Sequence, residues 1–214
     1  MERGFALEDA GGALTYLDEL WTDHGLRMNE GGCDPDGRFY CGSTAYDRRA
    51  GAGALYRLDP DGSVSVVLEN VTISNGIAWS PDGSRTYYND TATHRIDVFD
   101  YDSVAGLTGR RPFVDLSAEA ERPDGLTVDE EGGVWTALNG AGEVRRYSPD
   151  STLDEVVEVP ARKVTACTFG GPDLDQLFIT TSREDLKPGD DPLAGSLFRA
   201  VVGMRGLPVR EFAG

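Results

Sequence analysis

The chain repeats one segment at nearly constant spacing. Three copies open with Asn29, Asn75 and Asp124, and each continues through apolar residues into a turn. These openings are 46 and 49 residues apart, and a looser fourth copy begins at Thr165, 41 residues after the third. A propeller blade of four strands and its turns needs about 40–50 residues. The period therefore indicates a β-propeller.

Turn sequences separate short runs of strand composition. In these turns proline presets the first φ angle, aspartate bonds to its own backbone and glycine takes the positive φ. The turns lie at 34–37, 59–62, 80–83, 129–132 and 148–150. The expected strands between them include 54–58, 63–68, 95–99, 133–137, 143–147, 176–180 and 196–201. Helical periodicity is almost absent, so the sequence predicts an all-β fold.

Composition excludes several classes of protein. The 214 residues fit one domain spanning 1–214, and 37 acidic against 20 basic residues give a net charge of −17, which disfavours nucleic acid and anionic membranes as partners. No apolar run reaches the ~18 residues of a membrane span, and the amino end lacks the order of a signal peptide, so we expect a cytoplasmic protein. Cys33, Cys41 and Cys167 show no metal or disulfide spacing and are predicted to be small buried hydrophobes. The oligomeric state stays open.

The repeat places three polar residues at equivalent positions. The first strand of each blade lines the central channel, so Asn29, Asn75 and Asp124 are expected to project toward one point at one end of it. Three oxygen-bearing side chains could there converge on a ligand. Asn and Asp also cap turns before strands. The period alone leaves both interpretations open.

Five segments carry a family signature when they are taken in order. They are Arg27–Gly42, Ser74–Gly83 with the sequence SNGIAWSPDG, His94–Asp102, Pro123–Asp129 and Thr165–Gly171. Each alone is a common turn sequence, but together, at blade spacing, they resemble the SMP-30, regucalcin and gluconolactonase family. The resemblance covers the chain from about Gly4 to its carboxyl end.

The resemblance implies a six-bladed β-propeller that hydrolyses sugar lactones to aldonic acids with one divalent metal in its channel. It places Asn75 and Asp124 as metal ligands, with Asp124 also the catalytic residue. It places Arg27, Asn29 and Asp47 in contact with the substrate. An oxygen-only ligand set suits Ca²⁺, Mg²⁺ or Mn²⁺, and Zn²⁺ can also enter.

The chain departs from the family pattern at its amino end. The family's first metal ligand is a Glu in a GEGP-W type segment, and this sequence has no such segment. Met1 aligns about one and a half blades into the pattern, so we expect an incomplete propeller of about four and a half blades that lacks the N-terminal blade or two. Such a chain keeps two of the three protein ligands to the metal. It also leaves sheet edges that a closed ring would hide.

Two other functions compete with the lactonase. One is a non-catalytic or inactive propeller remnant that binds calcium or a partner, and the other is a related propeller esterase or phosphotriesterase. Arg27 with Asn29 favours the sugar lactone, because a scaffold needs neither. Other notable side chains have structural interpretations: Trp79 and Trp135 as blade core, isolated His24 and His94 without a site, and Asp34, Asp36, Asp82 and Asp129 as turn residues.

Overall fold

Four meandering sheets and one hairpin make up the computed structural model, which describes residues 1–214. The hairpin is β1 (Ala6–Glu8) with β2 (Leu14–Tyr16). Blade 1 is β3 (Leu26–Cys33), β4 (Phe39–Ala45), β5 (Gly53–Leu58) and β6 (Val64–Val71); blade 2 is β7 (Ser74–Trp79), β8 (Arg85–Asp90), β9 (Arg95–Asp102) and β10 (Gly106–Asp115). Blade 3 is β11 (Arg122–Val128), β12 (Val134–Asn139), β13 (Glu143–Tyr147) and β14 (Leu153–Glu158); blade 4 is β15 (Val164–Gly170), β16 (Gln176–Thr181) and β17 (Leu197–Val201). The one helical element is a 3₁₀ turn at Thr91–Thr93.

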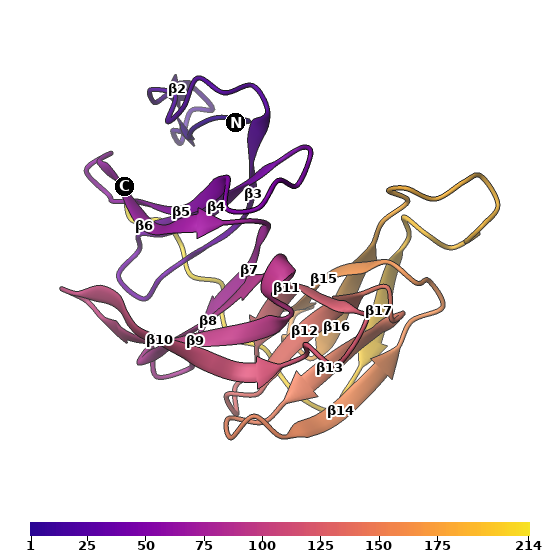
Figure 1. Cartoon of the computed structure of the whole chain (residues 1–214). Coiled ribbons are helices and arrows are strands. Elements are labelled where there is room, and N and C mark those ends of the chain that lie inside the picture. The colour runs from indigo at the N-terminus through magenta and orange to yellow at the C-terminus, as the bar shows by residue number, and fades with distance from the viewer.

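The blades are arranged around the first strand of each sheet. Every pairing within a blade is antiparallel and joins consecutive strands. Between blades, β7 packs against β3 and β11, and β11 packs against β7 and β15, so the four first strands form an arc (Figure 1). The predicted all-β incomplete propeller is therefore confirmed. It consists of three four-stranded blades, one three-stranded blade and the hairpin.

Each space between neighbouring blades holds its own apolar core. One cluster around Tyr40 and Trp79 joins blades 1 and 2, a second around Tyr87 and Leu126 joins blades 2 and 3, and a third around Trp135 joins blades 3 and 4. Strand alternation produces this arrangement, because every second side chain of a blade faces the next blade. Trp79 and Trp135 are buried, as predicted. The three cysteines are free, with Cys41 and Cys167 buried and Cys33 half-buried.

Three of the predicted turns close the first hairpins of blades 1, 2 and 3. Gly37, Gly83 and Gly132 have φ of +75°, +73° and +84°, and the amide of each donates back to the residue three earlier. A residue with a Cβ is strained at this φ, which explains why the repeat ends on glycine.

The C-terminal tail, residues 203–214, touches a turn of every blade. Gly206 N donates to Leu174 O at 2.8 Å in blade 4, and Arg205 O accepts from Glu130 N at 2.8 Å in blade 3. Arg210 then donates to Ser80 O of blade 2, and Ala213 N donates to Gly37 O of blade 1 at 2.9 Å. In Figure 1 the yellow tail runs from the last blade back to β6. The tail thus ties the first blade to the last.

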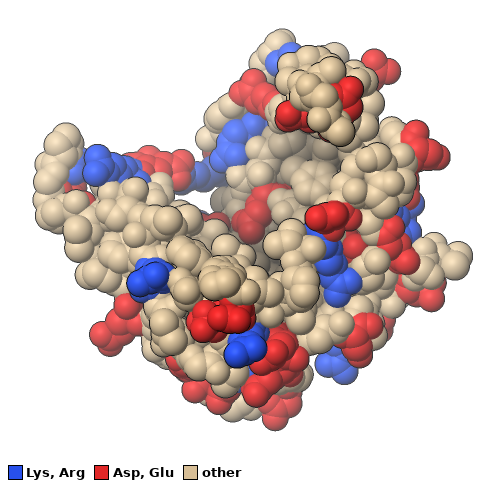
Figure 2. Space-filling view, turned by 180° about the vertical axis from the view of Figure 1, so that it is seen from behind, with Lys and Arg blue, Asp and Glu red and all other residues tan.

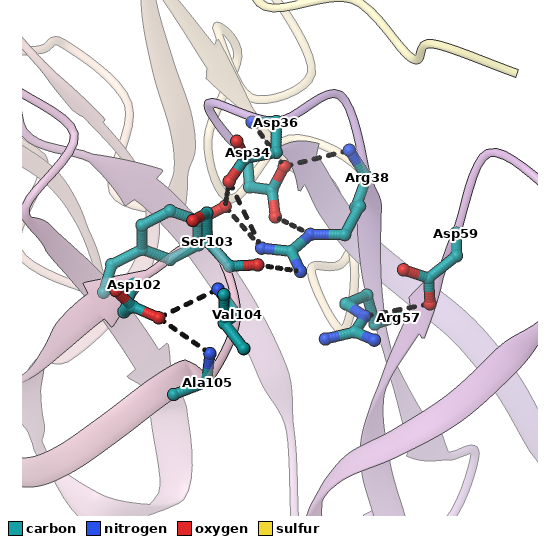
Figure 3. Close-up of polar contacts among 10 residues, drawn as sticks. Asp34, Asp36, Arg38, Arg57, Asp59, Asp102, Ser103, Val104 and Ala105 are labelled. Atoms are coloured by element: carbon teal, nitrogen blue, oxygen red, sulfur yellow. Dashed lines mark hydrogen bonds and ion pairs between the residues drawn. The ribbon is translucent and has the colours of Figure 1, made fainter.

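A buried arginine fixes blade 1 to blade 2 (Figure 3). Arg38 donates from Nε to Asp34 Oδ2 at 2.6 Å and from Nη1 to Ser103 O at 3.0 Å, and its Nη2 reaches the Tyr101 hydroxyl at 2.6 Å. Ser103 lies in the turn between β9 and β10. Asp34 is therefore both the turn residue that the sequence predicts and the counter-ion of a buried charge.

None of the helical segments has the length and apolar character required to traverse a lipid bilayer.

Candidate functional site

A bulge at the same point of every first strand directs the repeat's leading residue into the channel. The ladder register slips between Met28 and Gly31 in blade 1, between Ser74 and Ile77 in blade 2, and between Pro123 and Leu126 in blade 3. A bulge leaves residues unpaired and re-aims their side chains. Asn29, Asn75 and Asp124 each fall inside one of these slips. A residue that only capped a turn would not need such a bulge. The bulges therefore favour a channel-facing position for these three residues.

Glycine follows the leading residue in blades 2 and 3 because the next blade lies very close. A Cβ on Gly76 would lie 2.4 Å from Leu126 N, and one on Gly125 would lie 2.7 Å from Ala166 Cβ. Blade 1 has Glu30 at this position. Its carboxyl group therefore enters the channel region beside Asn29, where the other two copies have no side chain.

The first two leading residues are joined by hydrogen bonds. Asn29 Nδ2 donates to Asn75 Oδ1 at 2.5 Å, and Arg27 Nη1 donates to Asn29 Oδ1 at 2.6 Å. Asn75 Nδ2 donates in turn to Thr91 Oγ1 at 2.5 Å, and Thr91 donates to Pro123 O at 2.7 Å. This series runs from blade 1 to blade 3. In this series each amide donates through its nitrogen and accepts through its oxygen, which fixes the orientation of both amides.

Asp124 is held by two asparagines from neighbouring strands. Asn139 Nδ2 of β12 donates to Asp124 Oδ2 at 3.0 Å, and Asn89 Nδ2 of β8 donates to Asp124 O at 2.7 Å. The second oxygen, Oδ1, accepts no hydrogen bond from another side chain and can bind a ligand. Burial raises the pKa of Asp124 to about 6, against the opposing hydrogen bond from Asn139.

These side chains line one pocket at the open end of the channel. It has a volume of about 920 Å³ and is lined by Arg27, Asn29, Asn75 and Asp124 together with Glu30. Pockets of about 300–1,000 Å³ accommodate small-molecule ligands. Figure 2 shows a hollow in the middle of the molecule with acidic side chains inside it. Four of the five residues predicted from the sequence are thus brought together.

Asp47 does not join them. Its side chain is 62% exposed, pairs with Arg49 at 3.3 Å and lies outside the pocket lining. The neighbours of Asp47 on either side, Tyr46 and Arg48, do line the pocket. Its substrate contact stays a prediction. His24 and His94 also lie outside the pocket lining.

Glu30 is the site residue that sequence reasoning missed. Burial, and secondarily the charge of Asp124, raise the pKa of its carboxyl to about 8. No protein donor binds this carboxyl group. The repeat contains a sign of this role. The two following copies have glycine at the position of Glu30, because the next blade packs closely there, whereas blade 1 has a long acidic side chain.

We expect metal-free protein to lose stability as the pH rises from about 4.5 to about 8, because folded Glu30 keeps its proton over a range in which unfolded Glu30 has lost it. Between these values the folded state binds more protons than the unfolded state, so the free energy of unfolding falls with pH. Urea unfolding in EDTA at several pH values measures this slope. Glu30→Gln should flatten it, while Glu8→Gln on the exposed hairpin should not. An unchanged slope in Glu30→Gln would contradict the assignment.

The donor set fits a hard divalent cation. Asn75 Oδ1 and the carboxyl groups of Asp124 and Glu30 are oxygen donors on three adjacent first strands, and oxygen donors are the type that Ca²⁺, Mg²⁺ and Mn²⁺ prefer. These two buried carboxyl groups have raised pKa values, and neither forms an ion pair with an arginine or lysine side chain. No group of three His, Cys, Asp or Glu side chains gathers anywhere in the structure. A cation here therefore needs the amide oxygen or water to complete its shell.

The chain is similar in sequence and in structure to several known proteins. Rabbit (Oryctolagus cuniculus) regucalcin is 36% identical over 199 residues, which are 88% of this chain and 67% of regucalcin. The crystal structure of a calcium-binding protein, regucalcin, from Agrobacterium tumefaciens superposes with a TM-score of 0.92 at 31% identity over 99% of this chain and 75% of that one. The gluconolactonase XC5397 from Xanthomonas campestris has a TM-score of 0.68 at 25% identity, over 96% of this chain and 66% of that one.

The chain thus spans about two thirds of the length of the curated relatives that it matches. The model of the SMP-30/gluconolactonase/LRE-like region matches residues 1–183. The structural matches agree with the propeller arrangement described above. The chain belongs to the SMP-30/gluconolactonase/LRE-like family.

Proposed function

We propose that this chain hydrolyses sugar lactones to aldonic acids in the channel pocket with the help of a divalent cation. The observation that carries the proposal is the convergence of Arg27, Asn29, Asn75 and Asp124 from three bulged first strands on one pocket. A gluconolactonase among the solved relatives supports the reaction type, and a calcium-binding relative supports the cation.

Asp124 and Asn75 would hold the cation, and Glu30 would supply a further carboxylate oxygen. When bound, the cation provides positive charge that polarises the lactone carbonyl and stabilises the developing oxyanion. Its charge also compensates the two buried carboxylates. Asn139 donates to Asp124 Oδ2 and keeps that carboxyl group in its orientation.

The protein groups account for binding and proton transfer. Arg27 offers a planar fork of donors to the substrate's carbonyl or hydroxyl oxygens, and Asn29 holds it in place at 2.6 Å. Asp124 takes a proton from the attacking water, whose oxygen bonds to the carbonyl carbon. The ring C–O bond then breaks, and the proton passes to the departing alkoxide. Water and lactone thereby become one hydroxy acid.

Removal of the metal provides the test. We expect the EDTA-treated chain to open gluconolactone at the spontaneous rate, and the chain reconstituted with Ca²⁺, Mg²⁺, Mn²⁺ or Zn²⁺ to exceed that rate. A pH indicator follows the acid released. Arms with an aryl ester and an aryl phosphotriester test the related esterase and phosphotriesterase. Metal binding by calorimetry without turnover of any lactone would overturn the proposal and identify a non-catalytic cation-binding propeller.

A further inference from the structure

Basic side chains outnumber acidic ones in the lining of the channel pocket, although the whole chain is strongly acidic. The whole sequence has 20 basic and 37 acidic residues, yet the pocket lining has four basic side chains (Arg27, Arg48, Arg122, Lys163) and three acidic ones (Glu30, Asp124, Glu184). Since the surrounding field disfavours anions, this local excess of cations is the part of the molecule best suited to hold one. The four cations differ in whether a carboxylate of the protein already neutralises them.

Two of them are neutralised by carboxylates of one loop. Arg48 donates to Glu184 at 2.8 Å, and Lys163 lies 3.8 Å from Asp185. Glu184 and Asp185 follow β16, and Glu184 lines the pocket. These two cations therefore serve to fix that loop against blades 1 and 4.

Arg122 is available. It forms no ion pair and no side-chain hydrogen bond, and it is exposed. Arg27 also lacks a carboxylate partner, but its Nη1 is committed to Asn29 and to Met28 O. Arg122 thus brings a full set of free guanidinium donors to the pocket.

The position of Arg122 relates it directly to Asp124. It is the first residue of β11, two residues before Asp124, and it pairs in register with Asn139, the residue that donates to Asp124. Residues two apart along a strand lie about 7 Å from each other. A sugar ring with its carbonyl at Asp124 can therefore direct its far substituent toward Arg122.

We propose that Arg122 recognises an anionic group, a carboxylate or a phosphate, on the lactone substrate at the end remote from the reacting carbonyl. This inference rests on the proposed lactonase function and specifies its substrate class. Arginine suits the task because its donors match the paired oxygens of either anion. The preferred lactones are then acidic sugars, and neutral gluconolactone is the poorer substrate.

Equilibrium binding tests the assignment independently of turnover. Calorimetry on the metal-reconstituted chain compares glucuronate and glucose 6-phosphate with glucose. We expect at least one acidic sugar to bind about tenfold more tightly than glucose, as a charge-assisted hydrogen bond would give, and Arg122→Gln to remove that advantage. The two acidic probes distinguish a carboxylate from a phosphate. Arg162→Gln is the matched control, because Arg162 is exposed, lacks an ion pair and lies outside the pocket lining.

The outcomes separate this proposal from the function on which it rests. If both acidic sugars bind no more tightly than glucose, or if Arg162→Gln causes the same loss as Arg122→Gln, the assignment of Arg122 is wrong even where gluconolactone is hydrolysed. If the acidic sugars bind as expected while no lactone, neutral or acidic, is opened, the lactonase function is wrong and the anion site at Arg122 stands.

Discussion

Asp124→Asn is expected to lower both metal affinity and lactone hydrolysis by about 10³-fold, because the loss of a ligand charge and of the proton acceptor together removes several kcal/mol. Asparagine keeps the shape of the side chain, and the backbone bond from Asn89 to position 124 does not depend on the carboxyl group. Metal titration by calorimetry and the initial rate with gluconolactone measure the two effects.

Asp61→Asn is the matched control for this change. Asp61 lies in the exposed turn between β5 and β6, where its carboxyl bonds only to Ser63. The control should leave both quantities unchanged. An Asp124→Asn variant that binds the metal as tightly as the unaltered chain would show that position 124 is not a ligand.

Asp129→Ala should lower the free energy of unfolding by about 3–5 kcal/mol, since it removes one partner of a buried ion pair. Asp129 is fully buried, and its Oδ2 accepts from Arg146 Nε at 2.7 Å and from Trp135 Nε1 at 2.8 Å. Its Oδ1 accepts from the Gly133 and Glu131 amides at 2.8 and 3.0 Å. Alanine would leave a buried guanidinium and three N–H groups without this acceptor.

Urea denaturation measures the loss, and Asp150→Ala provides the comparison. Asp150 lies in the exposed turn between β13 and β14 and bonds to Ser148. Its replacement should cost much less than that of Asp129. If the two variants lose similar stability, the buried pair of Asp129 and Arg146 contributes no more than an ordinary turn.

The blades were predictable because their signals are local. A Pro-Asp-Gly turn is specified by four neighbouring residues, and strand alternation by a few more, so the turns at Gly37 and Gly83 appear where the sequence predicts them. The spacing of the repeated segment then predicts the length of each blade. Asn29 and Asn75 then meet in the pocket because equivalent positions of successive first strands face the same channel.

The remaining features depend on the path of the backbone and on which side chains meet in the folded blades, and the spacing of the repeat encodes neither. Glu30 became a site residue through a bulge and the proximity of the next blade. Asp47, by contrast, turns outward to Arg49 although its two neighbours line the pocket. The turn aspartates Asp34 and Asp129 have a second role as counter-ions of buried arginines: Arg38 follows Asp34 by four residues, whereas Arg146 reaches Asp129 from another strand.

The path of the C-terminal tail has a consequence for how the protein folds during synthesis. The tail residue Arg210 bonds to Ser80, 130 positions earlier, and Ala213 bonds to Gly37. Blades 1 to 3 consist of contacts between consecutive strands and can form as they leave the ribosome, whereas the tail contacts require the loop between these residues to close. We therefore expect the tail contacts with blades 1 and 2 to form late, after the contacts between consecutive strands within those blades.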